Sequence, residues 1–123
     1  MSSSRAVGTA LGVVAAAGAA AFVWGVAVER NRFTVRNEIV PVLPAGSRPI
    51  TVLHISDMHM APWQRRKQEW IASLATIVEP DLIVNTGDNM GHPEALSGVR
   101  AALDVFQGIP GVFVNGSNDY FGP

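Results

Sequence analysis

The spacing of apolar and polar residues changes along the chain, and these changes predict its elements. Residues 6–28 form an apolar run without a charged side chain. After residue 50, apolar positions come in short runs separated by stretches with helical spacing. A helix over 6–28 would be about 35 Å long, enough to cross the hydrocarbon core of a bilayer. The pattern therefore predicts a single-pass transmembrane (signal-anchor) helix, preceded by a short tail over 1–5.

A cleaved signal peptide is the competing interpretation of this run, because the small residues over 15–21, AAAGAAA, offer a cleavage site. We favour an uncleaved anchor, since the run is long for a signal peptide and Arg30 and Arg32 follow it as a stop. Basic residues after the run outnumber Arg5 before it. The positive-inside rule therefore favours the cytoplasmic face for the rest of the chain.

The remaining sequence alternates between strand and helix patterns. A linker over 29–49 contains an alternating stretch, 33–42, that predicts an edge strand. Beyond it, the patterns predict strands over 50–56, 81–87 and 111–115 and helices over 67–79 and 93–108. Strands separated by helices of this length form βαβ units with parallel neighbours. We therefore predict an α/β fold with a parallel or mixed sheet in a domain over 50–123.

Acidic, imidazole and amide side chains follow the three central strands of this prediction. Asp57 and His59 follow the first strand, Asp88 the second and Asn118 the third. Parallel neighbours bring these loops to the carboxyl edge of the sheet, where open α/β sheets bind ligands. Asp57 and His59 are two residues apart, so in an extended exit they would point the same way. Converging carboxylates repel one another, and a bound cation relieves that cost. One imidazole among oxygen donors suits Mn, Fe or Zn.

Composition excludes several classes of partner. Beyond the apolar run the chain has eight basic and ten acidic residues, a near-neutral balance that argues against a nucleic-acid partner. The chain has no cysteine, so we expect no disulfide partner. No glycine-rich phosphate loop follows any predicted strand, which argues against a nucleotide-binding domain.

Several other residues have ordinary structural interpretations. The basic cluster over 65–67 is expected to be a solvated helix face, with contact to anionic lipid headgroups or to a phosphorylated ligand as the alternative. We expect His54 to be a hydrogen-bonded core residue and His92 to be a solvated loop residue. Trp63 and Trp70 are expected to pack against the sheet.

Three short segments carry a resemblance to a known family. SDMHM (56–60), NTGDNMGH (85–92) and NGSNDYFGP (115–123) each follow a predicted strand. In this order they resemble the first three blocks of the calcineurin-like metallophosphoesterases, whose pattern is D-x-H, then G-D, then G-N-H-D/E. The resemblance covers 50–123. It implies the N-terminal half of a metallophosphoesterase sandwich, a dinuclear metal site and hydrolysis of phosphate esters.

The resemblance assigns roles by position. Asp57 and His59 would ligate the first metal, and Asp88 would bridge two divalent ions, with Mn, Fe or Zn expected. The third block departs from the family pattern. In the direct register Ser117 replaces the ligand Asn and Asn118 replaces the catalytic His. With a one-residue slip, which we favour, Asn118 is a metal ligand and Asp119 stands where the His would be, so both are candidate catalytic residues.

The later histidine motifs of the family have no match in this sequence. We therefore interpret the chain as an N-terminal part of a phosphoesterase with an incompletely ligated second metal. The expected partner is a phosphate-ester substrate, and membrane tethering favours a lipid-linked one. The alternative function is a membrane-anchored, non-catalytic α/β module that binds a metal or another ligand.

Overall fold

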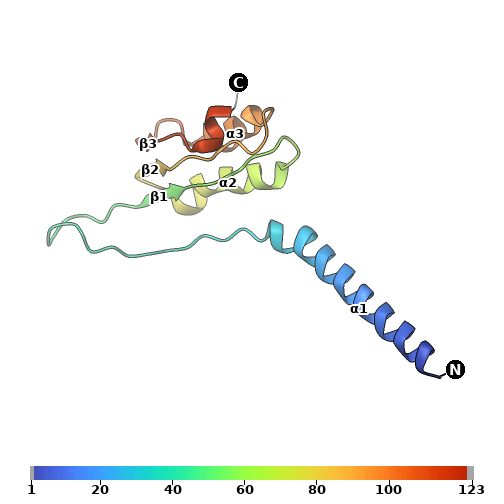
Figure 1. Ribbon diagram of the computed structural model, residues 1–123. Coiled ribbons are helices and arrows are strands. Elements are labelled where there is room, and N and C mark those ends of the chain that lie inside the picture. Colours follow the sequence, from blue (N-terminus) through green and yellow to red (C-terminus); the bar gives the residue numbers. More distant parts are fainter. Residues whose placement is uncertain (1, 122–123) are drawn as a thin grey trace. The chain divides into compact units, whose positions relative to one another are not determined.

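The computed structural model describes residues 2–121 and divides into two compact units between Arg36 and Asn37 (Figure 1). The first unit consists of α1 (Ser2–Ala27) and a short 3-10 turn, Glu29–Asn31. Its stretch Val7–Asn31 is long and apolar enough to cross a membrane, a property that signal sequences near an N-terminus share. The predicted helix is therefore confirmed, and it begins at Ser2 rather than after a separate tail over 1–5.

The predicted edge strand over 33–42 is wrong. These residues form no regular secondary structure, and nearly all of them are exposed. Alternation makes a segment compatible with a strand, but a strand also needs a neighbour whose backbone completes the hydrogen-bond ladder. A backbone bond within this stretch, from Val42 N–H to Val40 C=O, closes a local turn and joins no second strand. The segment is therefore a linker throughout.

The second unit is an α/β domain with a parallel three-stranded sheet in the order β1-β2-β3. Its elements in chain order are β1 (Val52–Ile55), α2 (Arg65–Val78), β2 (Leu82–Asn85), α3 (Leu96–Leu103) with a 3-10 turn (Asp104–Phe106), β3 (Gly111–Phe113) and a 3-10 turn (Ser117–Phe121). The three strands and two helices predicted after residue 50 are therefore confirmed. α3 begins three residues later than predicted, because 92–95 form a turn closed by the Ala95 N–H to His92 C=O bond.

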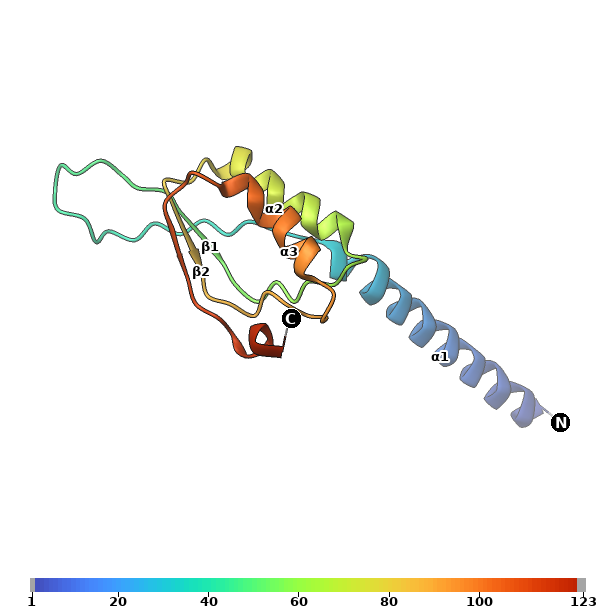
Figure 2. The ribbon, with the colours of Figure 1, turned by 90° about the horizontal axis from the view of Figure 1, so that it is seen from above.

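Both helices pack on the same face of the sheet and contact each other (Figure 2). Leu53 and Ile55 of β1 point toward α2 and α3 and are buried, whereas Val52 and His54 point to the other face and are exposed. The core between sheet and helices consists of Leu53, Ile55, Met58, Met60, Ile71, Leu74, Met90, Ala95, Val99, Ala102 and Phe106. Trp70 is half-buried against this core, as predicted.

The face of the sheet away from the helices is uncovered by the described residues. Val112 and Val114 on this side are 62% and 59% exposed, and Val52 is 48% exposed. His54 lies on the same face, where its Nε2 is 2.9 Å from Thr86 Oγ1. The expected hydrogen bond of His54 is therefore present, but its expected core position is wrong, because only the opposite face is covered.

The Asp81 carboxylate links the start of β2 to the start of β1. Asp81 accepts hydrogen bonds from the Thr51 backbone N–H (2.9 Å) and the Arg48 guanidinium (3.0 Å), and its own N–H donates to Thr51 C=O. The Thr51 bond is the largest influence on the pKa of Asp81. Partial desolvation opposes it, Arg48 reinforces it, and the net effect is a pKa below the ordinary value.

We therefore expect Asp81→Asn to lower the Tm at pH 7. Because the folded-state pKa lies below the unfolded one, the carboxylate stabilises the domain above the unfolded pKa, near 3.8, and this contribution is lost as pH falls through the folded pKa. The Tm difference should thus be constant between about pH 5 and 7 and shrink below about pH 4. Thermal unfolding of the detergent-solubilised chain followed by circular dichroism measures it.

The matched control is Asp104→Asn, whose side chain has a single 3.5 Å contact, with Gln107. It should melt close to the wild type throughout. Equal Tm values for the two variants at pH 7 would contradict the role of Asp81.

Candidate metal centre

The loops that follow β1, β2 and β3 lie at one edge of the sheet, because the three strands are parallel neighbours. Backbone pairing continues past the ends of β1 and β2 into the loops. Asp57 N–H donates to Gly87 C=O at 2.9 Å, His59 N–H to Asp88 C=O at 2.9 Å, and Met60 N–H to Asn89 C=O at 2.8 Å. Two loops that each carry candidate ligands are therefore held side by side.

The exit from β1 is not extended, contrary to the sequence prediction. Asp57, His59 and Asp88 have φ angles of 52°, 39° and 54°, in the left-handed region. The predicted common orientation of Asp57 and His59 is nevertheless present, since both are exposed while Met58 and Met60 between and after them are buried. The buried methionines anchor the loop in the core and leave the two polar side chains outside.

Three potential ligands converge at this edge. One ligand atom from each of Asp57, His59 and Asp88 can be chosen so that all lie within 4.8 Å of one another. His59 Nε2 is 3.9 Å from Asp57 Oδ1 and 3.9 Å from Asp88 Oδ2. The Asp88 side chain is the least exposed of the three, at 21%. Ser56 Oγ donates a hydrogen bond to the second Asp57 oxygen, Oδ2.

The loop after β3 joins the same cluster. The Asn118 side-chain amide lies 3.1 Å from His59 Nδ1, and its backbone N–H donates to Asp88 Oδ1 at 3.0 Å. Ser117 Oγ is 3.3 Å from the same Asp88 oxygen. All four residues predicted as ligands, Asp57, His59, Asp88 and Asn118, are thus brought together. The amide contacts the imidazole on the ring nitrogen opposite the carboxylates.

Asp119 accepts hydrogen bonds with both carboxylate oxygens. Oδ1 receives the backbone N–H groups of Asn89 (2.8 Å) and Met90 (2.9 Å), and Oδ2 receives that of Gly116 (3.0 Å). Burial alone would raise the pKa of Asp119, but these N–H donors outweigh it and hold the pKa below the ordinary value of 3.8. Asp119 is therefore an ionised acceptor at neutral pH. Its predicted catalytic role stays a prediction.

Two glycines allow the loops after β2 and β3 to approach closely. A Cβ on Gly87, whose φ is +91°, would overlap the backbone of Gly116, and a Cβ on Gly116 would overlap the Asp88 carboxylate. The motif glycines are therefore required by backbone and side-chain contact, not by loop flexibility.

The structure adds contacts that the sequence did not indicate. Lys67 Nζ donates to the Met58 backbone C=O at 2.9 Å, so the predicted solvated cluster over 65–67 includes a residue that supports the β1 loop. Asn85 Nδ2 donates to Asn89 Oδ1, and Asn85 Oδ1 accepts the Gly87 N–H, both at 2.9 Å. These Asn85 hydrogen bonds stabilise the loop after β2. Their one signal in the sequence is an amide residue at the end of an otherwise apolar strand.

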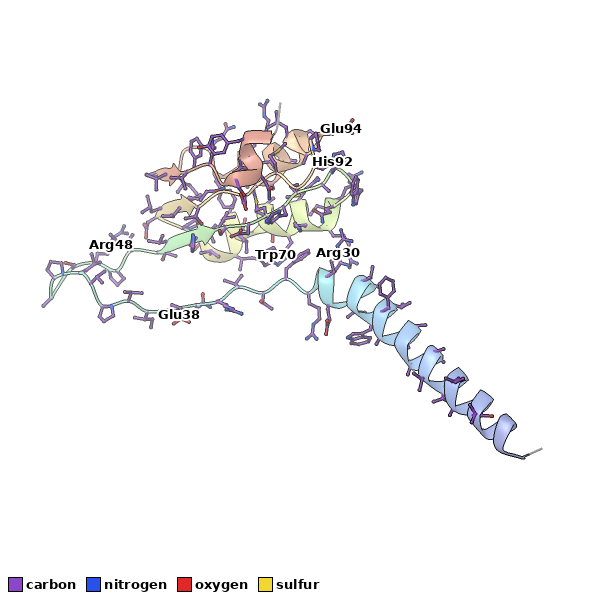
Figure 3. The ribbon with its side chains drawn as sticks, in the orientation of Figure 1. Arg30, Glu38, Arg48, Trp70, His92 and Glu94 are labelled. Carbon is purple, nitrogen blue, oxygen red and sulfur yellow. The ribbon has the colours of Figure 1, made fainter. Side chains whose placement is uncertain are left out.

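His92 and Trp63 lie at the rim of this edge and outside the cluster. Their rings make an edge contact with centroids 5.2 Å apart, and His92 Nδ1 accepts the Glu94 N–H. Figure 3 shows His92 and Glu94 at the helix-side end of the loop that follows β2. Trp63 is 67% exposed, so its predicted packing against the sheet is wrong. It packs against His92 because the turn over 61–64 precedes α2 at the domain surface.

Comparisons with protein-family models, with curated proteins and with solved structures gave no match to this chain.

We expect Gly116→Ala to weaken Mn²⁺ binding about tenfold or more, because the added methyl group displaces the Asp88 carboxylate. Isothermal titration calorimetry of the detergent-solubilised chain measures the affinity. Gly108→Ala is the control: its φ of +92° makes alanine unfavourable, but open space surrounds the position. Both variants should lose stability, and only Gly116→Ala should lose affinity. Unchanged affinity in Gly116→Ala would exclude the proposed contact as a determinant of binding.

Proposed function

We propose that the chain carries a divalent-metal site that serves the hydrolysis of phosphate esters, as the resemblance to calcineurin-like metallophosphoesterases implies. The observation that supports it is the convergence of Asp57, His59 and Asp88, whose ligand atoms lie within 4.8 Å of one another. These residues come from two different loops and belong to the D-x-H and G-D segments of the resemblance. The third segment contributes Asn118, next to both His59 and Asp88.

The donor set fits a transition-metal ion. Two carboxylates near one imidazole repel each other unless a cation lies among them, and nitrogen with oxygen donors suits Mn, Fe or Zn. Asp57, His59 and Asp88 would hold the first ion. A second ion would share Asp88 and use Asn118, with fewer protein ligands than the first among the described residues.

Each residue has a defined task in such a reaction. When bound, divalent cations supply Lewis-acid activation of water and of the phosphoryl group. Asp57 and Asp88 supply the negative charge that holds them. His59 contributes a neutral donor, oriented by the Asn118 amide at its other ring nitrogen. Asn118 can donate a hydrogen bond to a phosphoryl oxygen, but an amide does not transfer a proton to a leaving group.

An amide in place of a proton-donating imidazole favours a second candidate function, a membrane-anchored α/β module that binds a metal or another ligand without catalysis. The position in which the family carries a histidine is occupied by Asn118 or Asp119, depending on register. Asp119 accepts four hydrogen bonds and has a lowered pKa, so it is a poor proton donor at neutral pH.

Metal-dependent turnover separates the two candidates. For an enzyme, we expect Mn²⁺-dependent hydrolysis of a chromogenic phosphate ester, and Asp88→Asn should reduce both Mn²⁺ affinity and turnover about 100-fold, since it removes a shared ligand. Asp104→Asn should leave both unchanged. Mn²⁺ binding without turnover would support the binding module, and absence of Mn²⁺ binding by the wild type would refute both metal-based readings.

The apolar helix α1 supports a location at a membrane, with a lipid-linked phosphate as the favoured substrate and the cytoplasmic face favoured by the basic residues that follow the helix. We expect the chain to stay in the pellet after alkaline carbonate extraction and to retain its N-terminal residues in intact-mass analysis. A soluble product that begins beyond Ala27 would instead identify α1 as a cleaved signal sequence. Protease protection in oriented vesicles reports the face.

A further inference from the structure

We propose that Asp119 is a positioning residue that sets Asp88 in its ligating conformation before any metal binds. This inference rests on the proposed metal site. It differs from the role that the one-residue slip implies for Asp119, which puts it where the family carries its catalytic His.

The backbone of Asp88 adopts an unfavourable conformation. Its φ of 54° lies in the left-handed region, which few residues other than glycine adopt. Such conformations persist where the surroundings over-determine them. The two residues that follow, Asn89 and Met90, both direct their N–H groups to one oxygen, Oδ1 of Asp119, at 2.8 and 2.9 Å. That paired contact holds the chain in the turn that Asp88 requires.

Asp119 also links the loop after β2 to the loop after β3. The other oxygen of Asp119, Oδ2, accepts the Gly116 N–H at 3.0 Å and lies 3.3 Å from the Asn89 amide nitrogen. Asn118 N–H in turn donates to Asp88 Oδ1. The loops after β2 and β3 are thus joined twice, once by each aspartate, and each carboxylate accepts N–H groups from the opposite loop. Removing Asp119 leaves Asp88 to hold this junction alone.

Hydrogen bonds from the protein fill the acceptor sites of the Asp119 carboxylate, which leaves no oxygen lone pair for a metal ion. Both oxygens of Asp119 are engaged by the protein, and three of the four donors are backbone N–H groups. Asp119 also lines a cavity of about 530 Å³ beside β3, together with Asn85, Asn89 and the apolar side chains of α3. It therefore supports the ligands from the helix side of the loops. A neutral amide at this position would place an N–H group against one of the backbone donors.

The test measures metal affinity and local backbone order in the same full-length chain. We expect Asp119→Asn to weaken Mn²⁺ binding about 10–100-fold by calorimetry, the range typical for partners that orient metal ligands. In the metal-free state, amide hydrogen exchange of the segment 87–91 should become faster, while exchange in β1 and α2 stays unchanged. The Mn²⁺ electron paramagnetic resonance spectrum of the saturated variant should also differ from that of the wild type. Asp104→Asn is the matched control and should change none of these.

Three outcomes would count against the inference. Equal Mn²⁺ affinity in Asp119→Asn and the wild type would overturn the inference and leave the metal site standing. Faster exchange throughout the domain would also overturn it, because the loss would then come from general destabilisation. Absence of Mn²⁺ binding by the wild type would reject the proposed function and this inference with it.

Discussion

The candidate site depends on backbone pairing that continues beyond the strands. β1 and β2 pair in parallel, from Val52 with Leu82 to Ile55 with Asn85. The loops that follow continue to form backbone hydrogen bonds as far as the pair of Met60 and Met90. Because these bonds are between main-chain groups, they bring positions 57 and 59 next to position 88 without using the side chains of those three residues. Polar side chains can then occupy the edge while buried Met58 and Met60 hold the loop from beneath. The candidate ligands thus lie on paired backbone segments that the hydrophobic core stabilises.

The cost of this framework is backbone strain at the polar positions themselves. Asp57, His59 and Asp88 all adopt left-handed φ values, which glycine would adopt more readily but without offering a ligand. The glycines of the region, Gly87 and Gly116, are used instead where two loops touch. Carboxylates that accept backbone N–H groups offset part of the strain. A loop organised in this way is preorganised, so little ordering remains to be done when a ligand binds.

Much of this arrangement was accessible from the sequence. Helical spacing around Trp70 and Leu74 predicted α2, and the β-branched runs before Asp57 and Asp88 predicted two neighbouring strands whose ends meet. The order of elements then implied one shared edge. The edge strand over 33–42 and the core position of His54 were wrong for a common reason: alternation records which residues suit a sheet, but not whether a second strand or a helix lies against them. No described strand pairs with 33–42, and no described residue covers the face of the sheet that carries His54.

The amino-acid pattern alone is enough to predict the local elements, the apolar helix near the N-terminus and the polar residues that follow each strand, because these depend on periodicities of two or 3.6 residues within a short window. Tertiary packing, by contrast, sets the left-handed exit from β1, the contact of Asn118 with His59 and the hydrogen bonds of Asp119 with Asn89 and Met90. These contacts join residues roughly 30 or more positions apart. Such pairs are selected by strand order and register, which arise when the whole core packs and which no short stretch of sequence encodes.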